Sequence, residues 1–361
     1  MMLLERLATG DPVHRYSKCI VVPFTGKRRV LSTCPLNGGY REDLVAVFNN
    51  DGNPGAGMAC TLRAPTYAEH MALIAREIDL DSAHTAGMST AASMENVAIV
   101  HEKFENLRVA AIVTGGVEVN GGRVGDPASW TERQGKTEPA RLGTINIMLF
   151  TNVDLQPGPL ARAMVTCTEA KTAALQELAA PSRYSMGLAT GSGTDGTIVV
   201  ANAESQVCLT NAGKHSKLGE LIGRCVKAAV KEALHRQSGM NPQRQHQVLR
   251  RIDRFGLTEE KLWELYRAAG GQGSRGDYSE ALWNLSHQGE MVAAAALYAH
   301  LLDELMWELL TTQEAWAMGQ KLLGIMEKRH LPAEEGPDDG EAMVQHMIDA
   351  LAKSINNLLR I

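Results

Sequence analysis

The residues richest in chemistry lie in one stretch, PSRYSMGLATGSGTDG, at 181–196. Ser192 and Thr194 offer hydroxyls there, Asp195 offers a carboxylate, and Arg183 adds a cation. Four glycines in the stretch let the backbone turn sharply and pass close to a ligand. The stretch is too polar for a core, so we predict that it forms one wall of a reaction or binding site.

The glycines of this stretch also match a nucleotide fingerprint, but the residues after them exclude that interpretation. Gly191, Gly193 and Gly196 fit the pattern G-x-G-x-x-G. In dinucleotide-binding folds those glycines stand between a strand and a helix whose N-terminus binds pyrophosphate. Here the residues at 197–201 are mostly β-branched and predict a strand. We therefore predict a loop that enters a strand, and a ligand other than a nucleotide.

A long helix predicted over 159–178 must position two further charged groups. Proline stands near its first turn, and its middle is almost all small or apolar. Glu169 and Lys171 stand in it two residues apart, which turns them about 200° from each other, so each needs a partner elsewhere. The alternative, that a side chain only reaches the surface, weighs more for Lys171 than for Glu169. We expect Asp195 and Ser192 to face Glu169.

A second helix is predicted over 217–236, and its start is rich in polar groups. Lys214, His215 and Ser216 precede it, and Lys217 opens it. Free backbone N–H groups and two lysines favour an anion at this end, such as a developing oxyanion or a substrate carboxylate. The simpler alternative is that Ser216 only caps the helix.

Other polar groups stand in predicted turns and strands. Asn37 precedes a glycine in a turn, and the glycine-rich run at 114–126 follows a strand, which is a typical place for a ligand loop. Asn146 is the polar residue of an apolar strand predicted over 143–150. A buried amide without a hydrogen bond costs about 1–3 kcal/mol. Asn146 must therefore tie two strands together or face a ligand.

The composition excludes several classes of protein. The 361 residues carry a net charge of −5 with an estimated pI of 6.1, and no basic stripe is interleaved with aromatics, so nucleic acid is not an expected partner. No run approaches the roughly 20 apolar residues that span a bilayer, and we expect a cytoplasmic protein. Six scattered cysteines, Cys60 among them, are expected to be reduced and buried. The histidines show no ligand spacing, so we expect no metal site.

The order of predicted elements indicates an α+β fold, because strands and helices do not alternate as in a doubly wound sheet. We expect a mixed or largely antiparallel sheet packed with long helices over 1–241. Residues 242–361 are expected to form an all-helical module for packing, dimerisation or covering the site. The other predicted elements are three strands over 18–49, a helix over 65–78 capped by Thr66 and Glu69, two strands over 96–113, a nearly continuous helix over 280–326, an acidic linker over 332–340 and a last amphipathic helix.

Together and in this order, seven stretches resemble the adenosylcobinamide amidohydrolase family over about residues 18–240. They are VLSTCPLNGG at 30–39, AGMSTAA at 86–92, GVEVNGGRVGDPA at 116–128, GTINIMLF at 143–150, ARAMVTCTEAKTAALQEL at 161–178, PSRYSMGLATGSGTDG at 181–196 and GKHSKLGELIGRCVKAAVKEAL at 213–234. The resemblance implies hydrolysis of the amide between an aminopropanol arm and a corrin ring, giving adenosylcobyric acid. Cobalt would arrive with this corrinoid substrate, and the protein would need no cofactor of its own. The alternatives are a non-catalytic corrinoid-binding protein and an amidohydrolase for another tetrapyrrole or metal chelate.

The residues leave two routes to amide hydrolysis. In the favoured route, Glu169 or Asp195 activates water while Lys171, Lys214 or the N-terminus of the 217–236 helix holds the oxyanion. In the other, Ser192 or Thr144 attacks the carbonyl with His215 as base. We expect a further set of residues to bind substrate, namely Asn37, Asn120, Arg123, Asp126, Thr144, Asn146, Arg183, Thr194 and Lys214.

Overall fold

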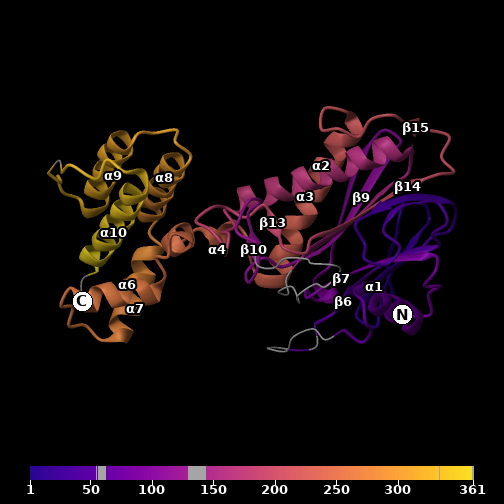
Figure 1. Ribbon diagram of the computed structural model, residues 1–361, viewed down its shortest axis with the longest axis horizontal. Coiled ribbons are helices and arrows are strands. Elements are labelled where there is room, and N and C mark those ends of the chain that lie inside the picture. The colour runs from indigo at the N-terminus through magenta and orange to yellow at the C-terminus, as the bar shows by residue number, and fades with distance from the viewer. Residues whose placement is uncertain (54, 56–61, 129–143, 333, 360–361) are drawn as a thin grey trace. The chain divides into compact units, whose positions relative to one another are not determined.

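The computed structural model describes residues 1–53, 55, 62–128, 144–332 and 334–359. The chain divides into two compact units, Met1–Asn241 and Pro242–Ile361 (Figure 1). Cys60 and the segment at 129–143 lie outside the described residues.

Two mixed sheets form the first unit, and they confirm the predicted α+β class. In the larger sheet β11 and β14 run parallel, whereas the other neighbours are antiparallel. Its strand order is β5 (Gly39–Arg41), β4 (Arg28–Ser32), β14 (Gly196–Asn202), β11 (Ile145–Thr151), β9 (Leu107–Gly115) and β8 (Ala98–Phe104). In the smaller sheet β6 and β7 are parallel. Its order is β1 (Met2–Arg6), β2 (Pro12–Tyr16), β3 (Cys19–Pro23), β6 (Ala46–Asp51) and β7 (Thr85–Thr90).

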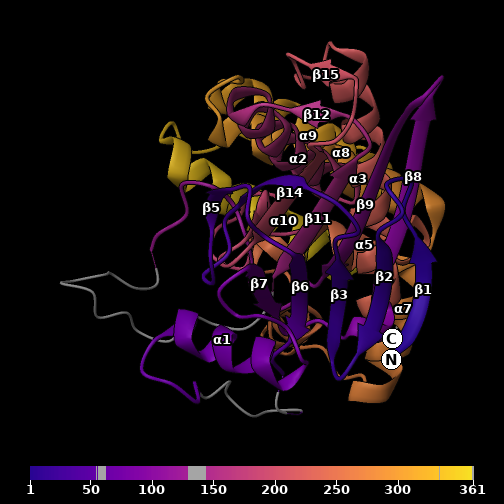
Figure 2. The same cartoon turned by 90° about the vertical axis from the view of Figure 1, so that its right-hand side faces the viewer.

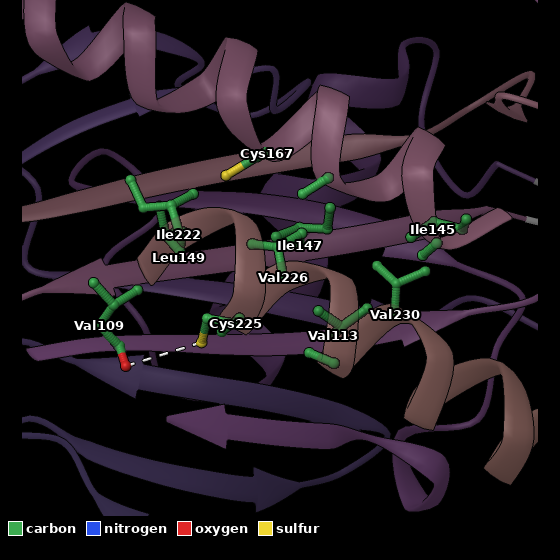
Figure 3. Close-up of a cluster of buried hydrophobic side chains, with 14 of the residues drawn as sticks. Val109, Val113, Ile145, Ile147, Leu149, Cys167, Ile222, Cys225, Val226 and Val230 are labelled. Atoms are coloured by element: carbon green, nitrogen blue, oxygen red, sulfur yellow. Dashed lines mark hydrogen bonds between the residues drawn. The ribbon is translucent and has the colours of Figure 1, made fainter. Parts of the chain in front are cut away.

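Two long helices, α2 (Pro157–Glu177) and α3 (Lys217–Ser238), cover one face of the larger sheet. Ile147 of β11 belongs to the buried cluster on this face, together with Cys167 of α2 and Val226 of α3 (Figure 3). Fully burying an aliphatic side chain of this kind contributes roughly 1.5–3 kcal/mol. The packing of these helices thereby fixes which residues of α2 can reach the edge of the sheet.

The opposite face of the larger sheet packs against the smaller sheet. Because side chains alternate along a strand, Met148 of β11 lies on this side, in a second buried cluster with Val47 of β6. Phe48 lies on the outer face of the smaller sheet and packs in a third cluster with Met71 of α1 (Tyr67–Glu77). Figure 2 shows α1 beside β6 and β7 of that sheet. The unit therefore has four layers, in the order helices, sheet, sheet, helix.

The helix starts follow their predicted caps. Thr66 and Glu69 form a reciprocal capping box at α1, and Ser216 accepts a hydrogen bond from the backbone N–H of Gly219 at 3.1 Å at the start of α3. Each cap satisfies N–H groups that the first turn of a helix leaves unpaired, typically contributing about 1 kcal/mol.

Several short elements were not predicted from the sequence. They are β1, β2, β7, the single-turn helix at Met94–Asn96 and a parallel pair of β12 (Asp154–Leu155) with β15 (Cys208–Leu209). Four of the five described cysteines are buried as predicted, whereas Cys208 is exposed.

The second unit is helical throughout its regular structure. Its helices are α4 (Pro242–Gln245), α5 (Val248–Ile252), α6 (Glu259–Ala268), α7 (Arg275–Ser286), α8 (Gly289–Met306), α9 (Thr312–Glu327) and α10 (Gly340–Leu358), with a single turn at Asp253–Phe255. Tyr298 is fully buried among them and donates to the carbonyl of Met347 at 2.8 Å. The prediction of a nearly continuous helix over 280–326 is wrong, because Gln288 and a capping box at Thr311 each start a new helix. Within the described ranges, no helix has both the length and the apolar character needed to cross a membrane.

Candidate functional site

Two glycine-rich loops that are distant in the sequence form one structure, residues 117–126 and 181–195, which we call the loop pair. β10 (Gly121–Gly122) and β13 (Gly191–Ser192) join them as a short antiparallel ladder (Figure 1). Beside this ladder the backbone N–H of Thr190 donates to the carbonyl of Gly122 at 2.8 Å. Main-chain hydrogen bonds therefore fix the two loops to each other.

The loop pair meets the larger sheet where its two parallel strands begin. The second loop runs directly into β14, and Thr144 directly precedes β11. The hydroxyl of Thr144 donates to the carbonyl of Thr194, so the two strand starts are also joined across the edge of the sheet. This bond uses the only hydroxyl proton of Thr144 and favours a bracing role for that residue.

Asp195 lies at this edge, and its carboxylate accepts four hydrogen bonds. Oδ1 accepts from the Ser192 hydroxyl at 2.7 Å and from the backbone N–H of Ile145 at 2.9 Å. Oδ2 accepts from the backbone N–H of Ser192 at 3.0 Å and from the ammonium group of Lys171. A carboxylate offers about four lone-pair positions, so all of them are occupied. Asp195 therefore organises its neighbours and has no position left for a separate water.

Lys171 reaches Asp195 from α2 and is only 9% exposed. Lysine is seldom buried unless it is paired, and here the carboxylate balances its charge. Gly191 permits the approach, because a Cβ there would collide with the Asp195 carboxylate and lie 2.8 Å from the Lys171 Nζ. The expectation that Lys171 would reach the surface more readily than Glu169 is wrong, since Lys171 lies on the buried face of α2 with Ala170 and Ala174.

Glu169 lies on the exposed side of α2 and pairs with Lys214, with Nζ and Oε1 3.3 Å apart. As their spacing predicts, Glu169 and Lys171 do not pair with each other but with partners elsewhere. The carboxylate expected to face Ser192 and Asp195 is thus held in a surface ion pair, and Lys171 occupies the place beside Asp195. Exposed pairs of this kind contribute about 0–1 kcal/mol to stability.

The start of α3 is capped and salt-bridged rather than open. Lys217 pairs with Glu220 at 2.5 Å, and Ser216 caps the helix, as the simpler alternative from the sequence has it. His215 is exposed, and among the residues that the structure describes its side chain forms no hydrogen bond or ion pair. The hydroxyl of Ser192 is directed to Asp195 and not to His215.

Asp126 and Arg123, which the sequence assigns to substrate binding, brace the loop pair. The Asp126 Oδ2 accepts from the Ser182 hydroxyl at 2.6 Å and from the backbone N–H of Arg123 at 2.7 Å. Burial raises the pKa of Asp126, but hydrogen bonds from Ser182 and Ser185 outweigh burial and hold that pKa below its ordinary value. The Arg123 guanidinium donates to the carbonyl of Leu188 at 3.3 Å. Ser182 was not among the site residues predicted from the sequence, although it follows Pro181, which opens the stretch at 181–196.

Asn146 ties the two sheets together, which is one of the two roles expected from its sequence, while its buried Oδ1 has no hydrogen-bond partner among the described residues. Its Nδ2 donates to the Oδ1 of Asn49 at 2.7 Å and to the carbonyl of Ser89 at 3.0 Å. Asn49 in turn donates to the Thr114 hydroxyl at 2.8 Å. Asn49 was also not predicted as a site residue. The pattern that could have indicated it is an amide directly after the apolar residues of a strand.

The remaining predicted binding residues have different surroundings. Asn37 donates from Nδ2 to the carbonyls of Ser82 at 2.9 Å and Thr85 at 2.8 Å, so it holds the turn before β7. Asn120 lies in the loop pair and is buried.

Arg183 and Thr194 are exposed on the loop pair. Arg183 donates from Nε to the carbonyl of Glu118 at 2.8 Å and so links the two loops. The backbone N–H of Thr194 lies 3.5 Å from the Ser192 Oγ. Both residues can contact a molecule that sits at Ser192.

Two sizeable cavities of the first unit lie at the other end of the larger sheet. One, of about 440 Å³, is lined by Thr151 and Asn152 beyond the end of β11, and the other, of about 500 Å³, includes Phe104 and Lys217. Asp195 precedes β14, which is the opposite edge, so cavity size and reactive groups indicate different places. The candidate site is placed at the reactive groups, because the buried Lys171 shares the Asp195 carboxylate with the partly exposed Ser192 hydroxyl. Across the described part of the chain, no three His, Cys, Asp or Glu side chains are grouped as metal ligands.

A family model described as adenosylcobinamide amidohydrolase matches residues 4–242 of this chain. The match ends at the boundary between the two units. An uncharacterized protein of Methanocaldococcus jannaschii is 36% identical over 238 residues, which are 63% of this chain and 89% of that protein. A solved structure from Pyrococcus horikoshii OT3 covers 64% of this chain and 81% of its own, at 14% identity and a TM-score of 0.30. So loose a similarity says nothing about the site.

Proposed function

The chain belongs to the adenosylcobinamide amidohydrolase family, and from this premise we propose that it hydrolyses the amide between the aminopropanol arm and the corrin ring of adenosylcobinamide. The products are adenosylcobyric acid and the free amino alcohol. Cobalt enters as part of the substrate, and the protein supplies side chains and shape. The family match covers the first unit alone, so we assign the reaction to that unit.

The observation that carries this proposal is the chain of contacts from Lys171 through Asp195 to Ser192 at the mouth of the loop pair. The Ser192 proton is directed to a carboxylate, and the Ser192 oxygen, which lies 3.5 Å from the backbone N–H of Thr194, is the atom that attacks the substrate carbonyl in this proposal. A nucleophile oriented by a base, which is oriented by a third group, is the arrangement that acyl transfer uses on unrelated folds. Ser192 is partly exposed, whereas its two supporting groups are nearly enclosed.

The proposed proton path balances within these three residues. The Ser192 hydroxyl attacks the amide carbon and passes its proton to Asp195. The C–N bond breaks as the leaving nitrogen takes a proton from the Lys171 ammonium, and Asp195 returns its proton to Lys171. Water then attacks the ester by the reverse path, releases the carboxylic acid and restores the serine. Well-placed proton transfer of this kind accelerates reactions typically by 10²–10⁴-fold.

A backbone donor next to Ser192 suits the oxyanion that forms during the attack. Gly193 follows the nucleophile directly and is exposed, whereas the backbone N–H of Thr194 is directed to the Ser192 Oγ. A Cβ at Gly193 would meet open space, so the glycine leaves room for a substrate carbonyl near its N–H. Removing one such donor in other enzymes costs about 10²–10³ in kcat.

The route in which Asp195 or Glu169 activates water has less support. All four acceptor positions of Asp195 are occupied, and Glu169 pairs with Lys214 on the surface. His215 has no contact that would orient it as a base for Ser192 within the described residues. The geometry therefore favours a serine route in which Asp195 takes the part expected of His215.

The test is incubation of the full chain with adenosylcobinamide, followed by mass spectrometry of the corrinoid and detection of aminopropanol. We expect both products in equal amounts. Tight binding without either product over hours would instead identify a non-catalytic corrinoid-binding protein. Cleavage of an amide on another tetrapyrrole, with adenosylcobinamide left intact, would change the assigned substrate and keep the reaction class.

A further inference from the structure

The loop pair exposes aliphatic side chains beside the proposed nucleophile. Val119 is 72% exposed, Val124 is 83% exposed and Met186 is 38% exposed. Single exposed aliphatic residues are ordinary on protein surfaces. Three on two short loops that are hydrogen-bonded to each other need a reason, since loops of this size usually expose polar groups.

The polar groups of the same loops are largely used inside them. Asp126 accepts from Ser182 and from the backbone of Arg123, and the backbone N–H of Val124 donates to the Thr190 hydroxyl at 2.9 Å. The loop pair is thus a braced frame whose polar groups hold it together and whose aliphatic groups face outward. Such a frame presents an apolar contact at little entropic cost, because its loops need no ordering on binding.

The segments that carry these side chains are joined to the reactive groups through the paired backbone of the loops. Gly121 pairs with Ser192 in the β10–β13 ladder, and Val119 and Val124 stand two residues before and three residues after Gly121. The Thr190 hydroxyl that holds Val124 belongs to a residue two positions before Ser192. A molecule with its amide at Ser192 and a large body would therefore extend over these residues.

We propose that Val119, Val124 and Met186 form the specificity surface of the enzyme, which binds the body of a macrocyclic substrate and so aligns its amide arm with Ser192. The inference rests on the proposed function, and it adds which residues select a large ring over a small amide. A corrin ring carries methyl groups between its amide arms, so its edge matches aliphatic side chains set in a polar frame. Selection of this kind acts on substrate binding and leaves the chemical step unchanged.

The test measures binding and hydrolysis separately in the full chain. Equilibrium dialysis in the Ser192→Ala background, followed by corrinoid absorbance, gives the Kd for adenosylcobinamide. Val124→Asp and Val119→Asp are expected to raise the Kd, and in the Ser192 protein the KM, by about tenfold or more, with kcat within about threefold. Val207→Asp is the matched control, because Val207 is 52% exposed in a loop beyond the far end of β14, and it should change neither value by more than about twofold.

The outcomes separate this inference from the proposed function. Hydrolysis with an unchanged KM in both aspartate variants overturns the specificity surface and leaves the reaction intact. Binding that depends on the valines without any hydrolysis overturns the reaction and keeps the surface. A lower Tm, or a change of oligomeric state by light scattering, with KM unchanged shows that the valines pack against protein and also overturns the surface. Val124→Ser repeats the measurement without adding a charge, and the inference requires it to weaken binding too.

Discussion

Two ion pairs of the first unit, Asp11–Arg28 and Lys171–Asp195, are largely enclosed and differ in what they can do. The side chains of Asp11 and Arg28 are 0% and 2% exposed and form a bidentate pair, with Arg28 Nε 2.9 Å from Oδ2 and Nη2 2.8 Å from Oδ1. The side chains of Lys171 and Asp195 are 11% and 13% exposed, and the Asp195 carboxylate also accepts from the partly exposed Ser192 hydroxyl.

The difference lies in the cation that each aspartate holds. Asp11 accepts hydroxyl hydrogen bonds from Thr9 and from the exposed Thr25, much as Asp195 accepts from Ser192. The cation of Asp11 is a guanidinium, which does not lose its proton in proteins, whereas the Lys171 ammonium can release one. The arginine pair can therefore only hold the N-terminal strands in place, whereas the lysine pair can also move a proton. Burial and charge alone do not distinguish a site from a strut.

The largest expected effect separates the two pairs by activity. Ser192→Ala should lower kcat by about 10⁴-fold or more, because it removes the group that forms the covalent bond. The protein should stay folded, since one partly exposed hydroxyl is lost. Intact-mass measurement after an acid quench should detect an acyl adduct on the unmodified protein and none on the variant.

Ser205→Ala is the matched control, since Ser205 follows the opposite end of β14 and its hydroxyl only accepts from a nearby backbone N–H. It should keep full activity. If Ser192→Ala also keeps full activity, and neither it nor the unmodified protein forms an acyl adduct, the reaction takes place away from the Lys171–Asp195 pair.

The next effect concerns stability. Arg28→Met should destabilise the first unit by about 3–5 kcal/mol, because it leaves the Asp11 carboxylate buried and unpaired. Four of the five tryptophans, at 263, 283, 307 and 316, belong to the helical unit. Tryptophan fluorescence therefore follows mainly that unit, and circular dichroism follows both. Urea unfolding should shift to lower concentration by circular dichroism while the fluorescence transition stays in place.

Arg63→Met is the control for this comparison, because Arg63 pairs with Glu77 where both side chains are about half exposed. Its effect should stay below about 1 kcal/mol. Equal effects of Arg28→Met and Arg63→Met would mean that enclosure does not set the importance of a pair in this unit.

A pH dependence follows from the enclosed pair. Burial raises the pKa of Asp11, but hydrogen bonds from Arg28, Thr25 and Thr9 outweigh burial and lower that pKa below its ordinary value. A carboxyl with a lowered folded-state pKa adds stability above its unfolded pKa and loses that contribution as the pH falls through the folded value. Urea titrations from pH 6 downward should therefore lose stability at acid pH, and Asp11→Asn should flatten that part of the profile.

Most strands of the larger sheet and the two helices that cover it could be predicted from the sequence because periodicity marks them, whereas the division into two packed sheets could not. Alternating and β-branched runs marked the strands of the larger sheet, and caps marked α1 and α3. β1 and β2 were missed because MLLER and PVHRY mix charged with apolar residues, and β7 was missed because TAGMST consists mostly of small residues. These segments are strands because they pair with neighbouring strands, and the local sequence gives no information about that pairing.

The candidate site was predictable in its parts and not in its pairing. Both glycine-rich loops were recognised, yet the ladder that joins them connects residues about seventy positions apart. The buried side of α2 was misjudged because alanine and threonine occupy many positions of that helix. No apolar stripe therefore marks the face that carries Lys171. A lysine in such a helix gives no sign of burial until Asp195 is placed beside it.

The smallest expected effect tests that correction directly. Glu169→Gln should change kcat and KM by less than about twofold, because its carboxylate pairs with Lys214 at the surface and not with the reactive groups. Lys171→Met, two residues away on the same helix, should lower kcat by at least about 10²-fold, since it removes the proposed proton donor. Steady-state assays of both variants decide which face of α2 serves the reaction. If Glu169→Gln loses more than about tenfold while Lys171→Met remains active, the exposed face carries the chemistry, and the Lys171–Asp195 pair is a strut like Asp11 and Arg28.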